Sequence, residues 1–377
     1  MSGKSSRIEY VGSPNVAPPM ADPGEPVLVD QIRDEIERDG PITFARFMEL
    51  ALYEPGLGYY AISSDRTTRQ GDFLTAPEMH PIFGWTLAGQ IEEMWTRLER
   101  PETFTVREYG AGSGALGRQL AERLAATGSE LAQALVYEPI EVEPRMQTPP
   151  PNGPMPGCVI GNELLDALPA HRVRNEGGSI RELMVGWKNG SFVDVPSDPS
   201  DERLAKAAAL LPPGHSTEVS LATAEWLRRV YDELTRGWVV LIDYGLPESD
   251  LLAPSRATGT VRAFRDQHVS SDVLSGVGRQ DITYHVNLDA LERDAAAAGF
   301  DVIGRTNAAR FLLGSGLDEV YRDARAEADL AWDTAALLRS SVRRLLDTGG
   351  LGGYAVIVLG KAVQREPLLR GLGFRAA

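Results

Sequence analysis

The chain has 377 residues, of which 43% are hydrophobic, and a formal net charge of −15 at pH 7. It is long enough for an α/β domain with its own core plus a second unit, and its acidic balance disfavours nonspecific nucleic-acid binding, which needs clustered Lys and Arg. Its one cysteine, Cys158, excludes an intrachain disulfide and a thiolate zinc site, and the five histidines show no ligand spacing, so we predict no metal site.

The N-terminal part of the chain predicts a tail followed by helices. Residues 1–26 are rich in Pro, Gly and Ser, which is typical of a disordered tail. Apolar residues then recur at helical spacing over 27–36 and 43–53. We predict an N-terminal helical region with a cofactor lid over 27–100, ahead of a core over 101–377. No apolar run is long enough to span a bilayer, and we predict a cytoplasmic protein without a membrane span.

The most informative motif lies at the end of the strand predicted over 104–109, where Glu108 stands two residues before Gly110, with Gly112 and Gly114 following. These glycines allow a sharp turn and close approach of a ligand to the backbone. The spacing fits a dinucleotide loop, the first motif of S-adenosylmethionine (SAM) methyltransferases, or an ordinary corner between strand and helix. A carboxylate at this position suits the ammonium of a methionine moiety, whereas it would repel a pyrophosphate on the same helix N-terminus.

Two further predicted strands end in polar side chains. The first ends at Glu138, at the distance from the glycines where a ribose-binding carboxylate belongs. The second, over 158–161, runs straight into Asn162, Glu163 and Asp166. Open α/β sheets bind ligands beyond the carboxyl ends of their strands, so we expect these side chains at one site.

The remaining elements complete an α/β pattern. An Asn-Gly dipeptide between two apolar runs predicts a hairpin, inside an insertion around 176–235. A strand predicted over 238–243 ends at Asp243, directly before Tyr244, and a last strand at 354–359 closes the sheet. Strands that alternate with helices in this way predict a mostly parallel sheet.

Together these motifs resemble the MidA-like proteins, whose mitochondrial members assist respiratory complex I assembly as protein-arginine methyltransferases. The resemblance runs from Val27 to the C-terminus and rests on the segments 71–78, 108–114, 162–169, 243–245 and 280–283. Ala111 and Ser113 stand where the family usually has proline and arginine. The resemblance implies a class I SAM-dependent methyltransferase fold, Rossmann-like, with a seven-stranded, mostly parallel sheet, an added helical and inserted lobe, and SAM as cofactor.

The resemblance also implies roles for particular residues. An arginine acceptor needs carboxylates that hold its guanidinium and localise a lone pair on one nitrogen. The implied catalytic residues are Glu163, Asp166 and Asp243. The implied cofactor contacts are Thr75, Pro77, Glu78, Glu108, Gly110, Gly112, Gly114, Glu138, Asn162 and Glu163. The implied substrate contacts are Asp72, Asp166, His171, Tyr244 and Asp281, among which His171 is either a base or a structural side chain.

Four functions stay open at this point. The leading hypothesis is a protein-arginine methyltransferase that acts on a complex I subunit or a similar basic segment. The second is an N- or O-methyltransferase for a small molecule. The third, a nicotinamide dehydrogenase, is disfavoured by the position of Glu108. The fourth is an assembly factor that binds SAM without turnover.

Overall fold

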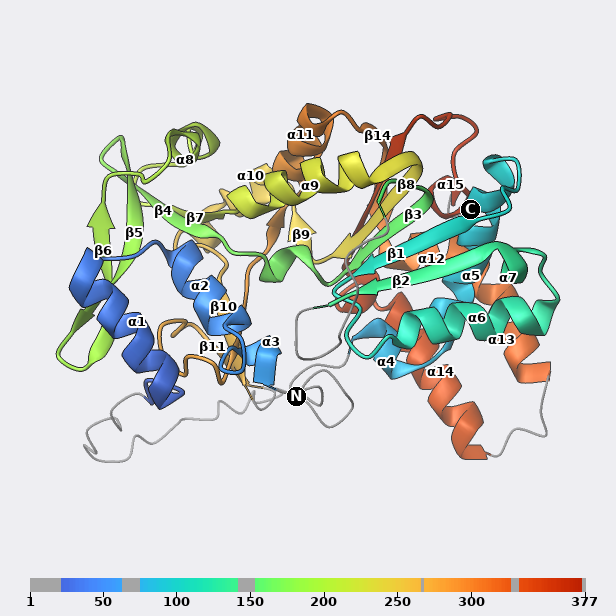
Figure 1. The fold of residues 1–377 in the computed structure, drawn as a ribbon, viewed down its shortest axis with the longest axis horizontal. Coiled ribbons are helices and arrows are strands. Elements are labelled where there is room, and N and C mark those ends of the chain that lie inside the picture. Colours follow the sequence, from blue (N-terminus) through green and yellow to red (C-terminus); the bar gives the residue numbers. More distant parts are fainter. Residues whose placement is uncertain (1–21, 63–74, 142–152, 266–267, 327–331, 375–377) are drawn as a thin grey trace, which may run out of the picture.

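The computed structural model describes residues 22–62, 75–141, 153–265, 268–326 and 332–374 (Figure 1). Most of the tail predicted over 1–26 lies outside these ranges, as does the substrate candidate Asp72. Within the described residues, no helix is long and apolar enough to cross a membrane.

A six-stranded sheet forms the centre of the molecule, with the strand order β14-β15-β8-β3-β1-β2. Neighbouring strands pair in parallel from β8 to β2, and β15 pairs antiparallel with both of its neighbours. The mostly parallel α/β sheet is therefore confirmed, with one strand fewer among the described residues than the predicted seven. The bounds are β1 (Phe104–Tyr109), β2 (Leu135–Ile140), β3 (Met155–Asn162), β8 (Leu234–Asp243), β14 (Asp301–Asn307) and β15 (Ala355–Lys361).

Helices cover both faces of this sheet (Figure 1). The pleat sends alternate side chains of β8 to opposite faces. Trp238 and Val240 join one core cluster with α5 and α6, whereas Val239 and Leu241 join another with α9 and α11. Burial on both faces explains why the strands are nearly continuous apolar runs. These helices are α5 (Ile82–Arg97), α6 (Ala115–Thr127), α9 (Leu221–Glu233) and α11 (Leu288–Ala298).

A second unit is built on antiparallel strands. The four-stranded sheet β6-β5-β4-β7 turns at Asn189 and Gly190, both with positive φ, as the predicted hairpin requires. A three-stranded sheet, β11-β10-β12, lies beside it. The strands are β4 (His171–Glu176), β5 (Ser179–Lys188), β6 (Ser191–Ser197), β7 (Ser216–Val219), β10 (Arg262–Arg265), β11 (His268–Ser270) and β12 (Asp281–Thr283).

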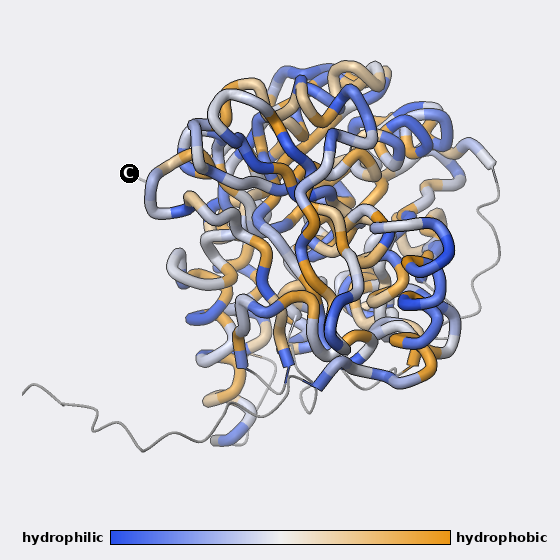
Figure 2. The backbone as a smooth tube through the Cα atoms, turned by 90° about the vertical axis from the view of Figure 1, so that its left-hand side faces the viewer, coloured by the Kyte–Doolittle hydropathy of each residue, from blue (hydrophilic) through white to orange (hydrophobic). Residues whose placement is uncertain are grey.

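The N-terminal helices α1 (Pro26–Asp39) and α2 (Phe44–Tyr53) pack on this second unit rather than on the central sheet. Phe47 of α2 meets Phe192 of β6 edge to face, with 5.2 Å between ring centroids. Figure 2 shows hydrophobic residues along the strands in the middle of the molecule and many hydrophilic residues on the outer turns and helices. The N-terminal helices and the inserted strands therefore share one core.

Short elements connect these parts. Helices α13 and α14 lie on either side of residues 327–331, which are outside the described ranges. The remaining elements are α3 (Tyr59–Ile62), α4 (Ala76–Met79), α7 (Leu131–Ala134), η1 (Leu165–Ala167), α8 (Glu202–Ala207), β9 (Gly245–Leu246), α10 (Glu248–Leu251), η2 (Pro254–Arg256), β13 (Val286–Asn287), α12 (Ala308–Gly314), α13 (Leu317–Ala326), α14 (Trp332–Leu346), η3 (Leu351–Gly353) and α15 (Arg370–Gly373).

Candidate active site

The glycine-rich turn between β1 and α6 has the backbone that its sequence predicts. Gly110, Gly112 and Gly114 all have positive φ, at 70°, 55° and 71°. A side chain would strain each of these positions. Gly117, one turn into α6, is needed for a different reason, because a Cβ atom there would lie 2.3 Å from the ring of Tyr137. The fourth glycine therefore lets helix α6 lie directly against β2.

Glu108, the last acid before the glycines, lies almost completely buried at the end of β1. Its side chain is 3% exposed and accepts a hydrogen bond from the hydroxyl of Tyr137. Burial raises the pKa of Glu108 to about 8, since the charged carboxylate has lost its water. Nearby, Asn162 at the end of β3 has a buried Oδ1 atom without a hydrogen-bond partner among the described residues. This part of the site therefore offers two acceptors to a cationic donor.

The turn after β3 is held by Asp243 from the neighbouring strand. Glu163 has a φ of 52°, a left-handed conformation that is uncommon for a residue with a side chain. One carboxylate oxygen of Asp243 accepts the backbone N–H groups of Leu164, Leu165 and Asp166, at 3.1, 2.7 and 3.3 Å. Its other oxygen accepts the N–H of the next residue in the chain. The carboxylate of Asp243 therefore fixes the backbone that presents Glu163 and Asp166.

The two acids on this turn lie close to one another, with Asp166 buried and Glu163 half-buried. Burial, together with the charge of Asp243, raises the pKa of Glu163 to about 7. Oε1 of Glu163 accepts a hydrogen bond from the side-chain amide of Asn162 at 3.1 Å. Burial also raises the pKa of Asp166 well above its usual range, with further contributions from the charges of Asp243, Asp281 and Glu163. Groups whose pKa values are shifted in this way, gathered in a cavity, mark a candidate active site.

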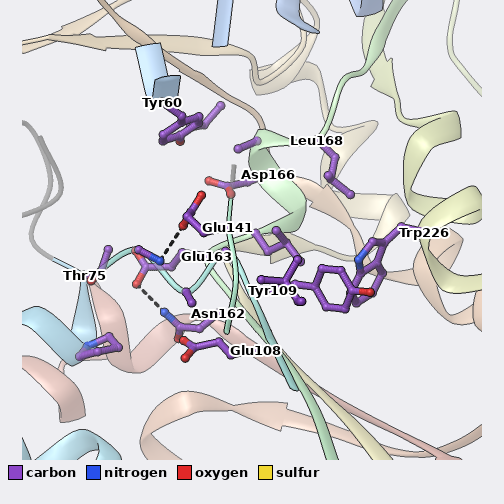
Figure 3. Close-up of a pocket in the computed structure, with 18 of the residues that line it drawn as sticks. Tyr60, Thr75, Glu108, Tyr109, Glu141, Asn162, Glu163, Asp166, Leu168 and Trp226 are labelled. Carbon is purple, nitrogen blue, oxygen red and sulfur yellow. Dashed lines mark hydrogen bonds between the residues drawn. The ribbon is translucent and has the colours of Figure 1, made fainter. Parts of the chain in front are cut away.

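Glu108, Asn162, Glu163 and Asp166 line a cavity of about 420 Å³ beyond the carboxyl ends of β1 and β3 (Figure 3). Among the described residues, seven carboxylates and one arginine, Arg229, contribute to its wall. The electrostatic potential inside the cavity therefore favours the binding of cations. The predicted site residues that line it are Thr75, Pro77, Glu78, Glu108, Gly110, Gly112, Asn162, Glu163, Asp166, Tyr244 and Asp281.

Glu138, the ribose candidate, does not line this cavity, and its predicted placement is wrong. Its carboxylate accepts two hydrogen bonds from the guanidinium of Arg107, at 2.9 and 2.7 Å. The pleat of β2 explains the error, since Tyr137 contacts α6 and Glu108, and the next side chain points to the opposite face. Glu141, just beyond the strand, lines the cavity instead and accepts the N–H of Gly112 at 2.6 Å.

Three other predicted residues also lie away from the cavity wall. Asp243 acts on the backbone behind it, as described above, and Gly114 caps α6 without reaching it. His171 pairs with the buried carboxylate of Glu182, with 2.7 Å between Nδ1 and Oε1. The other oxygen of Glu182 accepts the N–H of Ser200, so this pair holds the inserted sheet to the loop after it. A structural role for His171 explains these contacts.

Several lining residues were missed by sequence reasoning. Tyr53 and Tyr60 come from the N-terminal helices, and Tyr109 and Trp226 form an edge-to-face pair with 5.4 Å between ring centroids. Glu141 could have been found, because it is the first acid past the end of a predicted strand. The other missed residues include Arg229, Glu233, Thr283 and Tyr354.

The cavity fits the cofactor that the glycine-rich turn predicts. SAM carries an ammonium and a sulfonium, and the carboxylate of Glu108 and the unpartnered Oδ1 of Asn162 are acceptors suited to the ammonium. The carboxylate of Glu141 lies beside the glycine-rich turn, where a ribose hydroxyl could donate to it.

Comparisons with known proteins agree with this chemistry. Residues 86–150 and 147–306 match the model of a family of S-adenosyl-L-methionine-dependent methyltransferases. A mitochondrial protein of Drosophila melanogaster, named protein arginine methyltransferase NDUFAF7 homolog, is 25% identical over 93% of this chain and 90% of its own length. The human mitochondrial protein arginine methyltransferase NDUFAF7 is 25% identical over 83% of this chain and 78% of its own length.

A solved structure is also similar. The crystal structure of a Burkholderia thailandensis protein bound to S-adenosyl-homocysteine has a TM-score of 0.81 and 28% identity, and covers 93% of this chain and 96% of that chain. The curated relatives are named as mitochondrial proteins, and this finding overturns the prediction of a cytoplasmic location. The family match covers more than half of the chain, so the chain belongs to this family of SAM-dependent methyltransferases, and it is an enzyme whose cofactor is SAM.

Proposed function

We propose that the enzyme methylates a guanidinium nitrogen of an arginine in a basic protein segment. The observation that carries this proposal is the charge of the cavity, to which the part of the chain that the structure describes contributes seven carboxylates and one arginine. Glu233 pairs with Arg107, and one cationic cofactor does not balance the other six acids, of which Glu108, Asp166 and Asp281 are buried. A guanidinium as acceptor adds a second cation and offers planar pairs of donors to Glu163, Asp166 and Asp281.

The residues of the chain bind and orient the cofactor and the acceptor, and one of them accepts the proton that the acceptor nitrogen loses. When bound, the cofactor supplies a methyl group that is already activated by its sulfonium, so positioning dominates the rate. Thr75, Pro77 and Glu78 serve in this proposal as the lid on the cofactor side. The acceptor nitrogen loses one proton when its bond to the methyl carbon forms. Glu163, with its pKa near 7, is suited to take that proton at neutral pH.

The names of the relatives support a protein acceptor. Curated relatives from insect and human are named protein arginine methyltransferases. We extend that activity to this chain because the acids that the motif supplies lie together in its cavity. A basic segment of a respiratory complex I subunit is the first acceptor that we propose to test.

The test measures transfer of a labelled methyl group from SAM. The purified enzyme is incubated with arginine-rich peptides, with the same peptides in which lysine replaces arginine, and with a small-molecule extract of the source cells. We expect label on arginine peptides alone, located on the guanidinium by mass spectrometry. Label confined to the extract would identify a small-molecule methyltransferase instead. SAM binding without any transfer would identify a protein that assists assembly without turnover.

A double variant tests the assigned acids. Glu163→Gln with Asp166→Asn should abolish transfer and retain SAM binding within a few-fold, because Glu108 and Asn162 keep their side chains. Glu122→Gln, on the exposed face of α6, is the matched control and should leave transfer unchanged. Full activity of the double variant would refute the assignment of these two carboxylates.

A further inference from the structure

Two tyrosines of the N-terminal helices reach the cavity. Tyr53 is the last residue of α2, and Tyr60 lies in the short helix α3. Both line the cavity, with 5.5 Å between their ring centroids and 30° between their planes. Figure 3 shows Tyr60 on the opposite side of Asp166 from Glu108. The helical region that precedes the core in sequence therefore supplies part of the site.

The hydroxyls of these tyrosines bind groups from two distant parts of the chain. The hydroxyl of Tyr60 donates to the carboxylate of Asp281 on β12, at 2.9 Å from each oxygen. The hydroxyl of Tyr53 donates to the backbone carbonyl of Ala167, at 2.8 Å. Ala167 directly follows Asp166 in the 3₁₀ turn η1. Each tyrosine thus fixes the position of one acid, Tyr60 directly and Tyr53 through the backbone.

The two acids that they fix are buried and repel each other. Asp166 is 5% exposed and Asp281 is 4% exposed. The charge of Asp281 is one of the causes that raise the pKa of Asp166. Two carboxylates in one water-poor site are stabilised by a cation that both can contact. The tyrosine hydroxyls hold the acids in place before such a cation arrives.

The chemistry of this end of the cavity favours a guanidinium over an ammonium. A guanidinium is planar, presents five N–H donors and stacks on aromatic rings. The end of the cavity offers two carboxylates and the rings of Tyr53, Tyr60 and Tyr244. A compact ammonium would use fewer of these acceptors and would lose more hydration on entering.

We propose that Tyr53 and Tyr60 are positioning residues of the acceptor subsite, which hold Asp166 and Asp281 for a guanidinium and offer it their ring faces. This inference rests on the proposed function. It assigns acceptor recognition to the N-terminal helical region together with β12. The four-stranded inserted sheet then has no direct part in holding the acceptor cation.

The experiment uses the full chain saturated with S-adenosylhomocysteine, with agmatine as a probe that carries a guanidinium. Binding of agmatine is measured by ligand-observed NMR, and butylamine and the urea analogue of agmatine serve as comparison probes. We expect saturable binding of agmatine by the wild-type chain and at least fivefold weaker binding of both comparison probes. Tyr60→Phe should weaken agmatine binding about fivefold, the equivalent of one hydrogen bond. Tyr60→Leu, which also removes the ring, should weaken it further.

Controls separate a role at the acceptor from a general effect on the fold. Each variant should bind S-adenosylhomocysteine within twofold of wild type, and Tyr321→Phe, in the remote helix α13, should leave agmatine binding unchanged. Equal agmatine binding by wild type and both Tyr60 variants would refute the inference and leave the proposed function standing. Weakened binding of S-adenosylhomocysteine in parallel with agmatine would also refute it. Absence of agmatine binding to the wild-type chain would instead contradict the proposed guanidinium acceptor.

Discussion

Replacing Glu108 by Gln should change how the stability of the ligand-free protein depends on pH. Burial raises the folded pKa of Glu108 from 4.5 to about 8. The folded protein therefore holds this proton more tightly than the unfolded chain does, so the free energy of unfolding falls as the pH rises from about 4.5 to about 8. The gap between these pKa values corresponds to roughly 5 kcal/mol at most.

Thermal and denaturant unfolding between pH 5 and 9 test this value. Gln keeps the shape of the side chain and cannot ionise, so the stability of Glu108→Gln relative to wild type should increase with pH by several kcal/mol. The other buried acids with raised pKa values, Glu163, Asp166 and Asp243, are present in both proteins and cancel in the comparison. Glu122→Gln, on the exposed face of α6, should run parallel to wild type. A difference between Glu108→Gln and wild type that stays constant with pH would refute the argument.

The same variant tests the proposed contact with the cofactor. A cationic ammonium favours the ionised carboxylate, so binding of SAM to wild type near pH 7 should release a proton from Glu108. Calorimetry in two buffers of different ionisation enthalpy measures this release. Glu108→Gln should lose the proton release and bind SAM about 10- to 100-fold more weakly, the range for a hydrogen bond to a charged group. Unchanged affinity and unchanged proton release would place the ammonium elsewhere.

Three further predictions concern the residues around the cavity. Asp243→Asn should lower the free energy of unfolding by about 2–4 kcal/mol and lower kcat at least 100-fold, because an amide cannot accept all four N–H groups. Denaturant unfolding measures the first effect and a methyl-transfer assay the second. Unchanged kcat would contradict the positioning role of Asp243. In wild type, kcat/KM should rise with pH through about 7 as Glu163 ionises, and Glu163→Gln should remove that rise. A wild-type pH profile of kcat/KM that is flat from pH 6 to 8 would exclude Glu163 as the titrating group. Gly117→Ala should lower the free energy of unfolding by about 1–3 kcal/mol, and with it the melting temperature, since the added Cβ meets the ring of Tyr137. An unchanged melting temperature would show that α6 can shift away from β2.

Local signals predicted the parts of the site that depend on local structure. The glycines need positive φ, and Asn162, Glu163 and Asp166 follow a buried strand at the ligand-binding edge of the sheet, so both segments could be identified from the sequence.

Side-chain direction was harder to predict. Glu138 lies inside a strand, where the pleat turns it away from the cavity, whereas Glu141 lies past the strand end and reaches it. Asp243 ends its strand as predicted, but its carboxylate faces backbone N–H groups rather than the cavity. Tyr53 and Tyr60 reach the site only because the N-terminal helices pack on the inserted strands, and no local pattern encodes that packing.

The place of β15 in the sheet has a consequence for how the enzyme is made in the cell. This strand spans Ala355–Lys361 and pairs on both edges, with β8 on one side and β14 on the other. Until the ribosome has produced these residues, β8 exposes an unpaired edge made of an apolar run, which is prone to pair with other chains. Tyr354, which lines the cavity, emerges just before this strand. The sheet therefore closes and the cavity is completed only when the same short segment of the chain has been synthesised, and until then the edge of β8 stays unpaired.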